Sequence, residues 1–165
     1  MKIGIISDSH DNLPKIKKAV ETFNQERVEL VLHAGDLVSP FTSREFKNLN
    51  CPFKGVFGNN DGDKLFIREK FMEFGKFYPE TYQEVLSHKN ILMLHKEELI
   101  KALAESQRYD VIIYGHTHLT DLRKIGKTII INPGECGGWL TGKSTIALLD
   151  LEDLEVKIIK LVDSV

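Results

Sequence analysis

The sequence contains little that could crosslink the chain or hold it in a membrane. Its two cysteines, Cys51 and Cys136, form neither a C-x-x-C pair nor a zinc-ribbon pattern, so no disulfide framework is indicated. No apolar run approaches the roughly 20 residues that a membrane-spanning helix needs. The first residues lead directly into a strand pattern, without the apolar core of a secretory signal. These absences predict a cytoplasmic protein with no membrane partner.

An excess of positive charge is also missing. The 22 Lys and Arg residues are balanced by 24 Asp and Glu, and the net charge of −2 argues against a stable complex with nucleic acid. A nucleotide-sized substrate remains compatible with this balance. The 165 residues are 42% hydrophobic and 28% charged, and they show no repeat or linker. We therefore expect one domain over residues 1–165, with homo-oligomerisation left open.

Five short apolar runs are each followed by polar residues that can bind a metal ion. The runs cover residues 2–6, 28–32, 53–57, 91–94 and 111–114. The last one leads into a Gly-His-Thr-His motif, and alternate residues of an extended chain point to the same side. The residues after the five runs supply seven candidate metal ligands: Asp8, His10, Asp36, Asn59, His95, His116 and His118.

The order of the expected elements places these residues at one edge of a sheet. Strands at 2–6, 28–32 and 53–57 alternate with a helix from Pro14 to Phe23 and a short helix after Ser39, which favours a parallel arrangement. Ligands of such sheets bind beyond the carboxyl ends of the strands. The remaining chain predicts helices at 63–74 and 97–107, strands at 81–86, 90–94 and 111–114, and hairpins at 121–131 and 145–161. The fold class is therefore mixed α/β, a sheet-rich sandwich with helices outside.

The candidate ligands indicate two metal ions. Mixed imidazole and carboxylate ligands are typical of Mn, Fe, Co, Ni or Zn, with Mn favoured here. Seven ligands are too many for one four-coordinate ion but suit two ions that share a bridging carboxylate. Such pairs lie roughly 3.5–4 Å apart, lower the pKa of bound water to about 7 and stabilise phosphoryl displacement.

The same residues resemble the calcineurin-like metallophosphoesterases in order and spacing, from residue 8 to about residue 134. The length is similar to that of their small prokaryotic phosphodiesterase branch. The resemblance implies a four-layer αββα sandwich of two mixed β-sheets flanked by helices. It implies hydrolysis of a small or nucleotide-like phosphodiester, by in-line attack of hydroxide held between two divalent metal ions. By position, the first ion would be held by Asp8, His10, Asp36 and His118, and the second by Asp36 as bridge, Asn59, His95 and His116.

Three positions depart from the family pattern. Asn60 stands where larger members carry a histidine that can protonate the leaving group, and an amide cannot deliver a proton at neutral pH. This difference predicts modest turnover and a preference for diesters with good leaving groups. Lys96 and Glu135 replace residues that are commonly Gly and Ser, which leaves their roles open. Asp61 is expected to orient a metal ligand through hydrogen bonds.

Other interpretations of the sequence compete with this one. Residues 137–144 match the P-loop pattern, but a β-branched run follows where a P-loop requires a helix, so an ATPase is disfavoured. The six aromatic residues between Phe66 and Tyr82 are expected to pack in the core rather than form a substrate platform. The main alternative to an enzyme is a non-catalytic metal-binding or protein-interaction scaffold, similar to the retromer coat subunit of the same fold.

Overall fold

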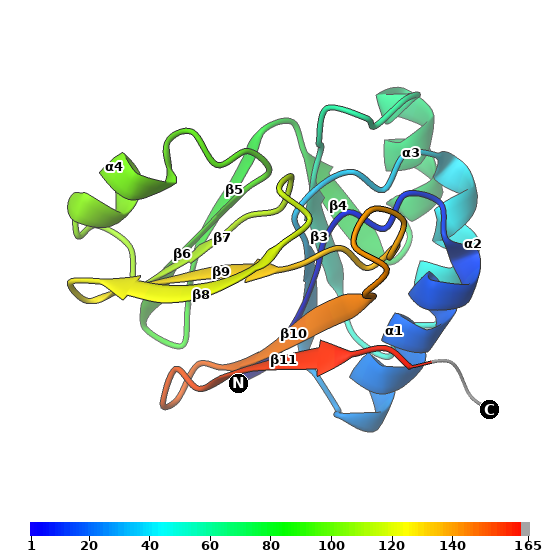
Figure 1. Cartoon of the computed structure of the whole chain (residues 1–165). Helices are drawn as coiled ribbons and strands as arrows, with labels where there is room; N and C mark the ends of the chain where they lie inside the picture. The colour runs from blue at the N-terminus through cyan, green and yellow to red at the C-terminus, as the bar shows by residue number, and fades with distance from the viewer. Residues whose placement is uncertain (163–165) are drawn as a thin grey trace.

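Two β-sheets pack face to face in the computed structural model, which describes residues 1–162, and helices cover their outer faces (Figure 1). The strand order is β11-β10-β1-β2-β3-β4 in the six-stranded sheet and β5-β6-β7-β9-β8 in the five-stranded sheet. Both sheets are mixed, and the layers run helix, sheet, sheet, helix. The αββα sandwich predicted from the family resemblance is therefore confirmed.

The six-stranded sheet has a parallel centre. It consists of β1 (Lys2–Ile6), β2 (Leu30–His33), β3 (Phe53–Val56), β4 (Gly75–Tyr78), β10 (Thr145–Asp150) and β11 (Val156–Lys160). The first four are parallel neighbours, whereas β10 runs antiparallel to β1 and β11. Ile6 pairs with His33, which pairs with Gly55, so these three strands end at the same level. Strands β1 and β2 are almost wholly buried because both faces of the sheet are covered.

The five-stranded sheet repeats this arrangement. It consists of β5 (Thr81–Leu86), β6 (Lys89–Leu94), β7 (Val111–Ile113), β8 (Thr120–Ile125) and β9 (Thr128–Pro133). Strands β6, β7 and β9 are parallel, and the antiparallel strands β5 and β8 form the edges. Met93 pairs with Ile113, so β6 and β7 also end at one level. The core between the sheets is mainly aliphatic, with Ile5 and Leu32 packed in one cluster with Ile113, and it also holds the buried ring of Tyr82.

Helices complete the two outer layers. They are α1 (Leu13–Gln25), the 3-10 helix η1 (Pro40–Thr42), α2 (Ser43–Phe46), α3 (Lys64–Phe71) and α4 (Ile100–Glu105). The apolar face of α1 buries Ile16 and Phe23 against the six-stranded sheet, together with residues of α2 and α3. Helix α4 covers the other sheet through Ile100 and Ala104. Among the described residues, no helix is both long and apolar enough to cross a membrane.

Two predicted helices are too long, and one strand was missed. The helix expected at 63–74 ends at Phe71, and Gly75–Tyr78 continues as β4. Only four residues form this strand, and their aromatic side chains extend the apolar pattern of the helix before them.

Phe77 packs with Phe53 and Phe71 in the core, as expected for this aromatic segment, whereas Phe66 is 37% exposed, contrary to that expectation. The helix expected at 97–107 is limited to α4. Residues 137–144 lead into β10, so no P-loop helix follows them.

Candidate metal centre

The loops that carry the candidate ligands all leave the carboxyl ends of parallel strands. Asp8 follows β1, Asp36 follows β2 and Asn59 follows β3, while His95 follows β6 and the two histidines of the Gly-His-Thr-His motif follow β7. The aligned ends of β1, β2 and β3 face those of β6 and β7 across the sandwich. Backbone hydrogen bonds join these loops, including Asp8 N–H to Gly35 O at 3.0 Å and Gly115 N–H to His95 O at 3.0 Å. The topology therefore brings distant parts of the sequence to one place.

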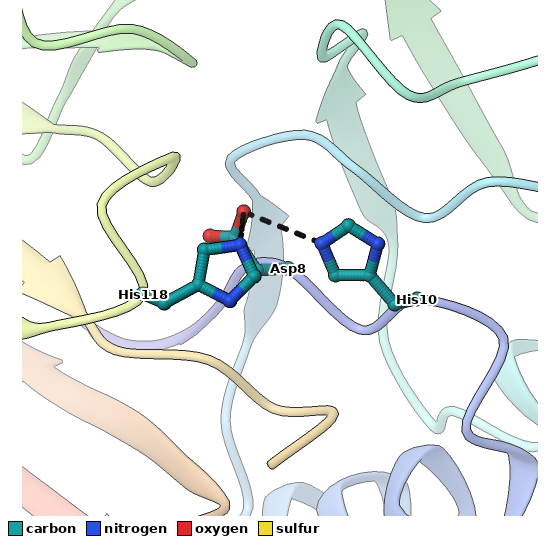
Figure 2. Close-up of side chains that lie close together, drawn as sticks. All are labelled: Asp8, His10 and His118. Carbon is teal, nitrogen blue, oxygen red and sulfur yellow. Dashed lines mark ion pairs between the residues drawn. The ribbon is translucent and has the colours of Figure 1, made fainter. Parts of the chain in front are cut away.

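Asp8, His10 and His118 form the first group. One ligand atom of each residue lies within 4.8 Å of the others. Asp8 Oδ1 is 3.6 Å from His118 Nε2 and 3.9 Å from His10 Nε2, and both imidazoles point toward this carboxylate (Figure 2). The two rings stack with their centroids 5.0 Å apart. This group has the shape of a cation site with one carboxylate and two imidazoles.

Asp36, His95 and His116 form the second group, again with ligand atoms within 4.8 Å of one another. His95 Nε2 lies 3.4 Å from Asp36 Oδ2 and 3.0 Å from Asn59 Oδ1. Asp36 Oδ2 also lies 3.7 Å from His10 Nε2 of the first group. One carboxylate oxygen therefore lies between both groups, and all seven predicted ligands are brought together.

The first group fits a divalent cation because two of its buried polar atoms have no hydrogen-bond partner. Asp8 Oδ1 and His10 Nε2 are both buried and unpaired, although they face one another. An unsatisfied buried polar atom costs about 1–3 kcal/mol, so native proteins pair such atoms or bind an ion there. The donor set, imidazole nitrogen with carboxylate oxygen, suits transition metals.

The pKa values of the two aspartates are shifted in opposite directions. Burial raises the pKa of Asp8 above its usual range, although Ser7 donates a hydrogen bond to its Oδ2 at 2.5 Å. Burial also acts to raise the pKa of Asp36, but hydrogen bonds from His95 and Asn60 outweigh it and hold the pKa well below its usual range. Asp36 is therefore ionised at neutral pH, as a bridging ligand requires.

The backbone around the centre is strained. Five of the seven candidate ligands have φ between 40° and 66°: Asp8, His10, Asp36, His116 and His118. Such conformations are sparsely populated for residues other than glycine, and they cluster at functional sites. Gly58 and Gly115 permit the close approach of the loops. An added Cβ would lie 2.1 Å from Asp36 Oδ1 at Gly58 and 1.9 Å from Ser7 Oγ at Gly115.

Asp61 joins the loops after β2 and β3. Its buried carboxylate accepts backbone N–H bonds from Gly58 at 2.6 Å, Val38 at 2.7 Å and Asp36 at 3.2 Å. Asn60 donates to Asp36 from its backbone N–H at 2.8 Å and from its side-chain amide at 2.7 Å. Both residues therefore hydrogen-bond to Asp36, and the expected role of Asp61 in orienting a metal ligand stays a prediction.

Glu135 has a role that the sequence left open. Its fully buried carboxylate accepts a hydrogen bond from Nδ1 of His118 at 2.8 Å. The same carboxylate accepts the backbone N–H groups of Leu140 and Thr141, at 3.0 and 2.5 Å, and the Thr141 hydroxyl at 2.7 Å. Burial acts to raise its pKa, but these hydrogen bonds outweigh it and the pKa falls below its usual range. Glu135 thus orients His118, and nothing in the local sequence distinguishes it from a loop glutamate.

The other residues singled out by the sequence lie outside both groups. His33 is buried, its Nε2 is 3.0 Å from Ser9 Oγ, and burial lowers its pKa to about 3, so it is a neutral core histidine. His88 and Lys96 are exposed. Sequence reasoning also missed Glu97, whose Oε2 lies 3.9 Å from His116 Nε2.

Comparison with known proteins agrees with this geometry. Residues 1–154 match the calcineurin-like phosphoesterase superfamily domain. The chain belongs to this superfamily. Among its superfamily relatives, phosphodiesterase MJ0936 of Methanocaldococcus jannaschii is 41% identical over 161 residues, which cover 95% of this chain and 97% of that protein. Phosphodiesterase YfcE of Escherichia coli is 27% identical over 81% of this chain and 78% of its own.

Two solved structures show the same fold. A structure described as a novel archaeal phosphodiesterase matches with a TM-score of 0.93 and 40% identity, covering 98% of this chain and 100% of that one. Vps29 of Entamoeba histolytica, complexed with zinc, matches with a TM-score of 0.75 and 23% identity, covering 100% of this chain and 95% of that one. The second likeness concerns the fold alone.

Proposed function

We propose that this protein is a metal-dependent phosphodiesterase acting on small or nucleotide-like diesters. The observation that carries the proposal is the pair of ligand groups joined by Asp36, whose Oδ2 lies 3.4 Å from His95 Nε2 and 3.7 Å from His10 Nε2. The 41% identity with a phosphodiesterase over nearly the whole chain supports the same activity. A protein-interaction scaffold that binds no metal would not need the strained loops that hold five of the seven candidate ligands.

The seven candidate ligands would form two metal sites that share Asp36. Asp8, His10, Asp36 and His118 would hold one ion, and Asp36, Asn59, His95 and His116 the other. Two divalent ions bound there would neutralise phosphate oxygens and lower the pKa of water to about 7. We propose a divalent transition metal, with manganese as the favoured one to test. The imidazole and carboxylate donors suit Mn, Fe, Co, Ni and Zn and do not by themselves select among them.

Asn60 limits the leaving groups that the protein can release. It stands at the rim of the centre, where its amide can donate a hydrogen bond to a phosphate oxygen but cannot deliver a proton to the departing oxygen. Substrates whose leaving groups depart without protonation should therefore react best. This limit favours activated diesters over simple alkyl monoesters.

The activity should depend on metal and distinguish diesters from monoesters. After treatment with a chelator, hydrolysis of bis(p-nitrophenyl) phosphate should fall at least about 100-fold, and added Mn²⁺ should restore it. The monoester p-nitrophenyl phosphate, which has the same leaving group, serves as the control and should react more slowly. Stoichiometric metal binding without turnover by any transition metal would favour the scaffold instead.

The proposal also covers the location of the protein, the size of its substrate and its oligomeric state. Both cysteines are unpaired, which supports a reducing, cytoplasmic location. The balance of 22 basic and 24 acidic residues supports a small substrate rather than a stable nucleic-acid complex. Self-association into a homo-oligomer is compatible with these features and is tested by the molar mass in solution.

A further inference from the structure

A pocket of about 500 Å³ opens beside the second ligand group. His95 and Asn59 belong both to that group and to the pocket wall. The other walls come from the end of β3, the start of α3, the turn between β4 and β5, and the segment before α4. The volume falls in the range of small-molecule sites and exceeds what a phosphate alone would fill. The pocket therefore extends the metal centre toward a larger part of a ligand.

Most of the area that lines the pocket is apolar, although four of its lining residues are charged: Lys64, Glu80, Lys96 and Glu98. Phe57 and Leu94 are buried, at 6% and 9% exposure, while Leu99 is 62% exposed and Pro79 lies on the turn between β4 and β5. The Lys64 ammonium lies 5.5 Å from the centroid of the Phe57 ring. An exposed leucine beside a hollow can bury apolar area when a ligand enters, at about 25 cal/mol per Å². These walls suit a flat apolar group more than a strongly hydrated one.

We propose that this pocket binds one ester group of the diester substrate and selects an aromatic group, an aryl ring or a base. This inference rests on the proposed function, because it requires the phosphate to be held by the adjacent ligands. A phosphate held by these ligands would have its ester groups near His95 and Asn59, and both residues line the pocket. A methyl ester would leave the hollow filled with water, whereas an aromatic group would cover Leu99.

The test measures binding to the manganese-loaded protein by calorimetry, without catalysis. Phenylphosphonate and methylphosphonate present similar anionic heads but differ in the organic group. Phenylphosphonate should bind at least about tenfold more tightly to the unaltered protein. Leu99→Asn, which keeps the size but removes the apolar surface, should reduce that preference about fivefold, while the affinity for inorganic phosphate changes less than twofold.

Leu122→Asn is the matched control. Leu122 is 51% exposed on β8, the edge strand opposite β5, and does not line the pocket. This variant should keep the full preference for phenylphosphonate. Equal binding of the two phosphonates, or a preference unaffected by Leu99→Asn, would overturn the inference even with phosphodiester hydrolysis present. Absence of hydrolysis and of phosphate binding would instead refute the proposed function, so the two failures are distinguishable.

Discussion

Asp36→Asn should reduce kcat/KM for bis(p-nitrophenyl) phosphate by about 10³-fold, equivalent to about 4 kcal/mol. The Asp36 carboxylate lies between the two ligand groups, and its Oδ2 is close to both His10 and His95. An amide at this position offers one oxygen without charge and an NH₂ group that repels cations. Asparagine tolerates the φ of 58° found at Asp36, so the loop should keep its conformation. The bound metal, measured by elemental analysis, should fall from two ions per chain to one or fewer.

Asp63→Asn is the control for this variant. Asp63 lies on the neighbouring loop, is exposed, and caps α3 by accepting the Phe66 N–H at 3.0 Å. Asparagine caps helices about as well as aspartate, so both activity and metal content should stay near those of the unaltered protein. If Asp36→Asn retained two ions and more than a tenth of the activity, Asp36 would not bridge the centre.

Glu135→Gln should weaken metal binding at the first ligand group by about 10–100-fold while the fold is retained. The Glu135 carboxylate accepts from His118 Nδ1, which requires the proton on Nδ1 and leaves Nε2 free to bind a cation. In glutamine, the oxygen that replaces Oε1 can still accept from Leu140 and Thr141, and the amide NH₂ then faces His118. The imidazole must then accept at Nδ1 and carry its proton on Nε2. That tautomer directs an N–H, instead of a lone pair, toward Asp8.

Nitrogen-15 spectra of the imidazoles in the metal-free protein test the tautomer directly, and this readout is independent of activity. His118 should show protonated Nδ1 in the unaltered protein and protonated Nε2 in Glu135→Gln. Glu152→Gln, at an exposed position, should change neither the tautomer nor the metal affinity. A Glu135→Gln protein with the original tautomer and unchanged affinity would contradict the role assigned to Glu135.

The clustering of the candidate ligands could be predicted because each of them is placed by a feature of the local sequence. Each follows a short apolar run, and parallel strands present their carboxyl ends at a common edge. His116 and His118 lie one residue apart on one loop, so the sequence alone shows that they are neighbours. The fold class followed from the same runs and from the family resemblance.

The remaining features depend on tertiary contacts that leave no mark in the local sequence. Strand β4 is four residues long and continues the apolar pattern of α3, so its pairing with β3 decides its conformation. Glu135 becomes a partner of His118 only because residues 135–141 fold around its carboxylate. The positive φ of Asp8 and His10 likewise comes from hydrogen bonds to the loop after β2, where Gly35 O and Asp36 O accept their N–H groups. Such conformations are imposed by the assembled loops rather than by residue preference.

The central claim is that two cations bind between these seven side chains, and anomalous diffraction from crystals soaked in Mn²⁺ tests it most directly. We predict two anomalous peaks roughly 3.5–4 Å apart, one among Asp8, His10 and His118 and the other among His95, His116 and Asn59, with Asp36 in contact with both. No peak at either position in well-diffracting crystals, or peaks only at surface carboxylates elsewhere, would contradict the claim.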